Sequence, residues 1–149
     1  MTGRKYEIKV RAKNYYTNYY NVNAPWSGSS TFYSSNLPAT VQALTYDVST
    51  RTKTDATVSW NLHITDADKG YSTIDVLYLL WMNDCHGGED FNTLLVNSTT
   101  TTLFTISSII PGSECRFRMN TLNIIGYSST YTPVLSVLFA IEPDAPPAP

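Results

Sequence analysis

The sequence predicts an all-β protein, and two observations lead to this prediction. Short runs rich in Val, Ile, Thr, Tyr and Phe alternate apolar with polar residues, which is the two-residue period of half-buried strands. Turn-forming residues separate these runs, and the longer period of an amphipathic helix is missing almost everywhere. With 149 residues, 42% hydrophobic and 15% charged, the chain is able to bury one good core.

Seven strands are expected after residue 36. They lie at Val41–Leu44, Thr57–Trp60, Ile74–Trp81, Phe91–Val96, Thr101–Ile106, Arg116–Leu122 and Tyr131–Ala140. The turns between them include the polar loop 65–70, the Gly-containing stretch 84–90, Pro111-Gly112 and residues 126–129. This number and spacing of short strands is typical of a two-sheet sandwich.

Part of the sequence occurs twice. Residues 111–123 repeat, in register, residues 2–14, so that Gly112 matches Gly3 and Asn123 matches Asn14. The period is about 109 residues, a usual size for one domain. The same offset places residues 32–39 over residues 141–148, where a Pro-Ala junction recurs. The chain therefore looks like a window cut from an array of similar domains, with one complete unit inside it.

These motifs, in this order, resemble the fibronectin type III family. An apolar residue precedes Pro111-Gly112, and the strand that follows ends in Asn123 before a Gly-Tyr-Ser-Ser turn. Trp60 falls where the family places a core tryptophan on strand B, and residues 77–81, with Leu77, Leu79 and Trp81, fall on its strand C. The resemblance implies an immunoglobulin-like seven-stranded β-sandwich over residues 37–146. Residues 1–36 would be strands F and G of a preceding repeat, and residues 147–149 the start of a following one.

The chain departs from the family pattern at Cys115, where such domains usually carry a tyrosine that caps the turn between strands E and F. The opening copy keeps this tyrosine as Tyr6. In this topology the end of strand C and the start of strand F lie at one pole of the same sheet, and we predict a disulfide between Cys85 and Cys115. The alternative is two separate thiols packed as small apolar groups.

This bridge would close a loop of about 30 residues and stabilise the domain by roughly 3 kcal/mol. It would also place the protein in an oxidising compartment, outside the cytosol.

A second departure is the loop from Tyr15 to Trp26, which is longer than its counterpart at residues 124–128 and rich in Tyr and Asn. Tyr and Trp are enriched at binding hot spots. The loop is therefore a candidate contact surface, although the alternative is that it folds back over its own sandwich. The candidate contact residues are Tyr15, Tyr16, Tyr19, Tyr20 and Trp26.

Asn97-Ser98-Thr99 is the only Asn-x-Ser/Thr triplet, and it falls on an expected loop between strands. We predict N-glycosylation at Asn97, with a chance occurrence of the triplet as the alternative. The segment 66–70 begins like a calcium loop but lacks its final Glu, and we interpret it as a solvated turn. His63 and His86 lack the spacing of a zinc site. We therefore expect neither a metal nor a cofactor.

Several classes of function are disfavoured by composition. The net charge of −2 offers no basic field for nucleic acid. The longest apolar runs, residues 76–82 and 134–141, fall well short of the roughly 20 residues that cross a bilayer. The sequence has no glycine-rich phosphate loop and no Ser/His/Asp arrangement. We therefore expect no nucleic-acid partner, no membrane insertion within this segment and no enzymatic activity.

We expect a structural extracellular or cell-surface module that forms part of a filament, stalk or adhesin. Its partners would be neighbouring copies of the same or similar domains, joined by short linkers that proline makes semi-rigid, and it would carry covalent glycans. The alternative is a recognition module, such as a receptor ectodomain or carbohydrate-binding accessory domain, that binds protein or glycan through the Tyr-rich loop. A third possibility is strand exchange between protomers through exposed strand edges.

Overall fold

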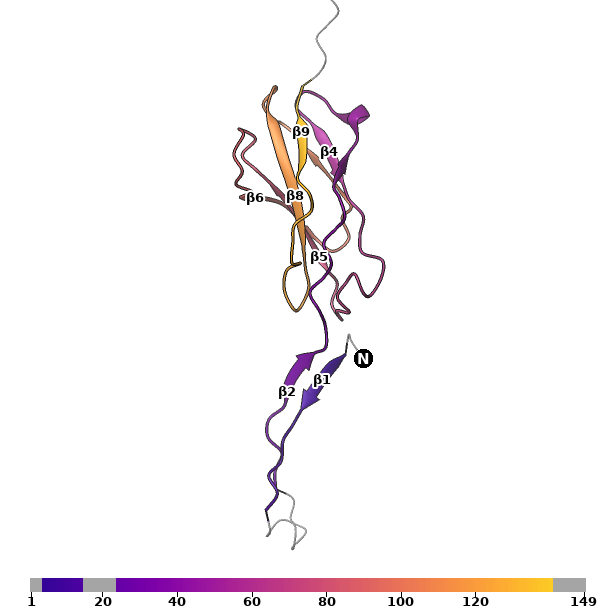
Figure 1. The fold of residues 1–149 in the computed structure, drawn as a ribbon, viewed down its shortest axis with the longest axis vertical. Coiled ribbons are helices and arrows are strands. Elements are labelled where there is room, and N and C mark those ends of the chain that lie inside the picture. The colour runs from indigo at the N-terminus through magenta and orange to yellow at the C-terminus, as the bar shows by residue number, and fades with distance from the viewer. Residues whose placement is uncertain (1–3, 15–23, 141–149) are drawn as a thin grey trace, which may run out of the picture.

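A computed structural model describes residues 4–14 and 24–140, and these residues form a sandwich and a separate hairpin (Figure 1). One antiparallel sheet has three strands in the order β3 (Thr45–Tyr46), β4 (Ala56–Ser59) and β7 (Leu103–Ile106). The other has four, in the order β6 (Thr93–Ser98), β5 (Leu77–Met82), β8 (Glu114–Leu122) and β9 (Leu135–Leu138). In the described part of the chain the helical content is the short 3-10 turn η1 (Val48–Thr50). The prediction of an all-β, seven-stranded sandwich is confirmed.

The core lies between the two sheets because successive residues of a strand point to opposite faces. In β8 the side chains of Cys115, Phe117 and Met119 are each 0% exposed, and they alternate with Glu114 and charged arginines. Trp60, which the sequence placed in the core, is 4% exposed. The opposing sheet contributes Val58 and Ile106, and β5 contributes Leu80.

The first strand begins only after its predicted range, Val41–Leu44, and the last strand is shorter than predicted. Val41 and Leu44 pack in the core, but strand pairing begins only at Thr45. At the other end, the strand predicted from Tyr131 pairs regularly with β8 only from Leu135, two residues after Pro133. Proline has no N–H to donate to a ladder, so the pairing with β8 starts beyond it.

The hairpin consists of β1 (Lys5–Ile8) and β2 (Ser30–Tyr33) and extends end-on from one pole of the sandwich (Figure 1). Its apolar side chains are exposed: Ile8 is 49% and Phe32 46% exposed, and the rings of Tyr6 and Phe32 stack with centroids 5.1 Å apart. The alternate positions are charged, and Lys9 Nζ lies 3.5 Å from a carboxylate oxygen of Glu7. A lone two-stranded hairpin is at best marginally stable in water.

The pairing of β1 with β2 repeats that of β8 with β9. Tyr6 lies opposite Phe32 as Cys115 lies opposite Val137, and the neighbouring pairs follow the same register. The backbone N–H of Ser34 donates to the carbonyl of Arg4 at 2.9 Å. Phe139 N–H donates in the same way to the carbonyl of Ser113, also at 2.9 Å.

A second pair of contacts matches at the other end of the two hairpins. Ser27 N–H donates to the Val10 carbonyl at 2.8 Å, and Val10 N–H donates to Ser27 Oγ at 3.0 Å. Thr132 and Met119 make the same two contacts at the same two distances. The likeness of the two hairpins therefore extends to a side-chain hydrogen bond.

This register corrects the uniform offset read from the sequence. The first strands of the two hairpins are related by 109 positions, as Tyr6 and Cys115 are. The second strands are related by 105 positions, so Phe32 corresponds to Val137 and not to residue 141. The longer loop between β1 and β2 accounts for the difference. The predicted boundary at residue 146, and the start of a further repeat at 147–149, lie outside the described residues.

Candidate functional site: the module junction and the disulfide pole

The segment between the hairpin and the sandwich is hydrogen-bonded to the sandwich at several points. Asn36 N–H donates to the Gly70 carbonyl, and the Asn36 carbonyl accepts from Nδ2 of Asn123 at 2.7 Å. Asn123 is 7% exposed, and its Nδ2 also donates to the Lys69 carbonyl at 3.1 Å. Ala39 N–H donates to the Asp68 carbonyl at 2.8 Å. We call residues 35–40 the linker.

The carbonyl of Ala39 accepts two further hydrogen bonds from buried or half-buried side chains. Thr121 Oγ1 donates to it at 2.8 Å, and Nε2 of His63 lies 2.7 Å from it, a donor in the tautomer protonated there. The backbone N–H of His63 in turn donates to the hydroxyl oxygen of Tyr78 at 2.6 Å, and burial raises the pKa of this phenol. Tyr78 belongs to β5, so these contacts connect the linker to the core sheet.

Gly70 makes room for the linker. Its φ of +69° lies in the left-handed region that glycine adopts without a steric penalty. A Cβ at this position would lie 2.3 Å from the Asn36 carbonyl oxygen and 2.8 Å from that of Leu37. Both are backbone atoms and cannot rotate away, so a larger residue at this position must displace the linker.

Sequence reasoning missed this role of the loop 65–70. The loop was interpreted as a solvated turn, and Asp66 and Ala67 are indeed exposed, but its last residue, Gly70, is buried beneath the linker. One signal was present: Asn123 recurs as Asn14 in the opening copy. Such a repeated polar residue at a strand end is a candidate for a structural hydrogen bond.

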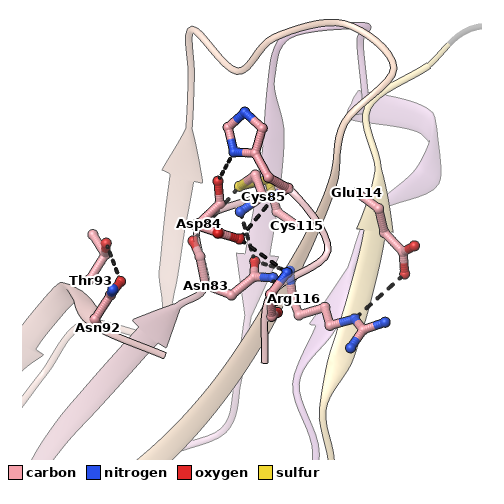
Figure 2. Close-up of a disulfide and its surroundings, with 10 residues drawn as sticks. Asn83, Asp84, Cys85, Asn92, Thr93, Glu114, Cys115 and Arg116 are labelled. Carbon is pink, nitrogen blue, oxygen red and sulfur yellow. Dashed lines mark hydrogen bonds and ion pairs between the residues drawn. A yellow bond between two sulfur atoms is a disulfide. The ribbon is translucent and has the colours of Figure 1, made fainter. Parts of the chain in front are cut away.

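Cys85 and Cys115 are joined by a disulfide, with an S–S distance of 2.03 Å and Cα atoms 4.1 Å apart (Figure 2). Both residues are buried, at 8% and 0% exposed. The bridge joins the turn after β5 to the start of β8 across 30 residues. With both thiols oxidised, neither cysteine is available as a nucleophile or metal ligand beside His86.

Asn83 shapes the turn that brings the two cysteines together. Its backbone N–H donates to the Arg116 carbonyl at 3.1 Å, and its side-chain Oδ1 accepts from Arg116 N–H at 2.9 Å and from Cys85 N–H at 3.2 Å. The amide thus extends the β5–β8 ladder by one step while the chain turns away (Figure 2). Asn83 is 0% exposed, and its Nδ2 donates to the Gly88 carbonyl.

Asp84 caps the same turn from outside. Its Oδ1 accepts from the backbone N–H groups of His86 at 3.0 Å and Gly88 at 3.3 Å. The hydrogen bond from His86 is the main reason that the pKa of the Asp84 carboxyl is lowered. The imidazole Nδ1 of His86 lies 2.5 Å from the Asp84 carbonyl oxygen.

The remaining predicted site residues fall in three places. Asn97 is exposed as expected, but it lies on β6 and not on the predicted loop between strands, because β6 extends to Ser98. Trp26 is 58% exposed, and the guanidinium of Arg11 lies 4.7 Å from its ring centroid. The other predicted contact residues, Tyr15, Tyr16, Tyr19 and Tyr20, lie outside the described residues.

Within residues 4–14 and 24–140, no group of three or more His, Cys, Asp or Glu side chains is arranged to hold a metal ion. In the same residues, no helix has the length and apolar character needed to cross a membrane.

No protein-family model matches the sequence, and no curated protein matches it. Solved structures are similar at the level of fold. The FN1–FN3 domains of chicken CNTN1 align with a TM-score of 0.56 and 15% identity over 91% of this chain and 43% of that one. Domains A168–A170 of titin align with a TM-score of 0.57 and 14% identity over 76% of this chain and 37% of that one.

A single fourth FNIII domain from human aligns with a TM-score of 0.58 and 16% identity, over 76% of this chain and 88% of that one. The chain thus spans less than half of the two multidomain structures and most of the single domain. The sandwich formed by β3 to β9 has the fibronectin type III fold.

Proposed function

We propose that this chain is a segment of an extracellular array of fibronectin type III modules whose junctions hold neighbouring modules in a fixed orientation, as a surface filament, stalk or adhesin requires. The observation that carries the proposal is the linker, whose backbone groups are hydrogen-bonded to the complete module on both sides of Pro38. Pro38 is itself buried. A linker held in this way has no freedom to act as a hinge.

Residues 1–36 are, in this proposal, strands F and G of the preceding module. The matched register and the matched hydrogen bonds of the hairpins β1–β2 and β8–β9 support this assignment. The apolar side chains of β1 and of the residues just after it correspond to those of β8 that are buried against the second sheet: Ile8 corresponds to Phe117 and Val10 to Met119. The alignment with a three-domain structure over 91% of the chain is consistent with a tandem arrangement.

The short distance between the modules supports a rigid junction. β2 ends at Tyr33, and Ser35 Oγ already donates to the Tyr71 carbonyl of the next module at 3.1 Å. Two extended residues span only about 7 Å. The preceding module therefore has almost no free chain in which to turn.

An extracellular location is supported by the disulfide. Such bridges persist in oxidising compartments and are rare in the cytosol. The bridge contributes roughly 3 kcal/mol for a loop of this length, which suits a module selected for persistence.

The junction is tested by distance measurements on the full chain. Spin labels are placed at Thr31 in β2 and Ser136 in β9, which are exposed and occupy equivalent positions in the two hairpins. The labels are attached through an unnatural ketone-bearing amino acid, so that the native disulfide is not disturbed. Electron–electron double resonance should give one narrow distance distribution.

Gly70→Ala should broaden this distribution, because the added methyl group displaces the linker. Gly87→Ala is the matched control: its φ of +89° is also positive, but nothing lies within 4 Å of the added Cβ. A broad distribution in the unmodified chain would refute the rigid junction. Equal distributions in the two variants would show that Gly70 does not hold the linker.

A further inference from the structure

Asn97 lies on the outer face of the four-stranded sheet, at its edge. It pairs in register with Leu79 of β5, one position beyond the pair Val96–Leu80, whose side chains lie in the core. Alternation along the strand therefore places Asn97 on the opposite, outward face. Among residues 4–14 and 24–140, β6 is the last strand on its side of the sheet, and no further strand lies beyond Asn97.

Within the triplet Asn97-Ser98-Thr99, only the middle residue contributes its side chain to the fold. Ser98 Oγ accepts from the backbone N–H groups of Thr100 and Thr101, both at 3.2 Å, and so shapes the turn into β7. Neither the side-chain amide of Asn97 nor the side-chain hydroxyl of Thr99 makes a hydrogen bond within the described part of the chain. The two groups that define the N-glycosylation triplet are thus not needed by the fold.

The surface next to Asn97 carries an aromatic ring that is mostly covered but not fully buried. Trp81 lies two residues along β5 from Leu79 and is therefore a diagonal neighbour of Asn97, within reach of long side chains. Its Nε1 donates to Asn120 Oδ1 at 3.0 Å, which fixes the indole on the outer face. The exposed part of a fixed indole offers an apolar surface to the C–H groups of a sugar ring.

On the side of Trp81 that faces β8, the side chains of this sheet face are held in place by contacts with aromatic rings. Arg118, the in-register partner of Trp81, lies between two rings, with its guanidinium carbon 4.3 Å from the Phe91 centroid and 3.9 Å from that of Tyr131. Cation–π contacts of this kind are attractive and hold the guanidinium in place. The outer face beside Trp81 is thus held in place by Arg118 and the two rings that flank it.

From this geometry we propose that Asn97 carries an N-linked glycan whose first sugars pack on the indole of Trp81 and cover this part of the outer sheet face. The proposal rests on the extracellular location given under the proposed function. It assigns the glycan a structural role, because a sugar that packs on a fixed ring protects an apolar surface from water.

Occupancy is tested by secreting the full chain from eukaryotic cells and measuring its intact mass. Native protein should carry the mass of one glycan, which peptide:N-glycosidase removes while converting residue 97 to Asp. Asn97→Gln and Thr99→Ala should abolish it, whereas Asn92→Gln, an exposed amide on the same strand edge but outside the triplet, should not. Secreted, disulfide-bonded protein without sugar on Asn97 would overturn the proposal.

Packing is tested on the glycosylated protein. Nuclear Overhauser contacts are expected between the innermost sugar and the indole protons of Trp81, and enzymatic deglycosylation should lower the melting temperature. In Trp81→Leu that decrease should shrink, whereas in Trp26→Leu, on the hairpin, it should persist. Absence of the contacts would refute the packing, even if Trp81→Leu fails to fold. These results are independent of the spin-label distances, so a failed glycan and a flexible junction are distinguishable.

Discussion

The hairpins β1–β2 and β8–β9 have the same backbone pairing and opposite burial. They share their register, two main-chain hydrogen bonds and one side-chain hydrogen bond. Yet Phe117 and Met119 are 0% exposed, whereas Ile8 and Val10 are 49% and 65% exposed. Pairing is therefore a property of the two strands themselves, while the core also requires the second sheet that β3, β4 and β7 supply.

The largest expected difference between the two hairpins comes from removing equivalent apolar side chains. Phe117→Ala should lower the free energy of unfolding by about 3 to 5 kcal/mol, because it leaves a cavity between the sheets. Ile8→Ala should change it by no more than about 0.5 kcal/mol, because that side chain is half exposed. Urea unfolding of the full chain, with the disulfide intact, measures both values.

Comparable losses in the two variants would show that the exposed face of β1 is covered in solution. The hairpin would then be part of a closed core formed by another chain.

The second comparison is between Cys115 and Tyr6, which occupy the same position in the two hairpins. Replacing both Cys85 and Cys115 with Ala should cost about 2 to 4 kcal/mol. Reductant should destabilise the native chain by a similar amount and leave the double variant unchanged. If reductant has no effect on the unfolding midpoint of the native chain, the bridge does not stabilise this domain.

The third prediction concerns Asn123, which joins the hairpin to the complete module. Asn123→Asp keeps the acceptor for Ile125 N–H but replaces the donor Nδ2 by an oxygen that faces the carbonyls of Asn36 and Lys69. The loss should be about 1 to 3 kcal/mol, because two carbonyls lose their partner. Asn92→Asp, an exposed control, should cost less than about 0.5 kcal/mol. Equal costs would argue that the linker is not held by Asn123.

The smallest expected effect is a dependence on pH at the turn that carries Cys85. The pKa of Asp84 is lowered chiefly by the hydrogen bond from His86 N–H. Its contribution to stability is therefore present above the unfolded pKa of about 3.9 and is lost as pH falls through the lower folded value. Asp84→Asn should weaken the decline of stability in acid. Asp90→Asn, on the same loop, removes a charge but not this hydrogen bond. If it weakens the acid decline of stability as much as Asp84→Asn does, the decline does not come from the hydrogen bond to Asp84.

The sequence was sufficient to predict the structural features that depend on local residue patterns. The strands, the inward position of Trp60 and the cysteine pair all follow from alternation, turn residues and the family resemblance. The hydrogen bonds that hold the linker could not be predicted, because Gly70, His63 and Asn123 are distant in sequence and meet only after the sandwich closes. The uniform offset was wrong in β2, since a longer loop changes the offset without changing the pairing.

The fixed orientation of the hairpin β1–β2 relative to the sandwich is tested most directly by residual dipolar couplings of the backbone amides. Couplings from Lys5–Ile8 and Ser30–Tyr33 should fit the same alignment tensor as those from β5 and β8. Couplings from the hairpin that average toward zero, or that need a tensor of their own, would contradict the account.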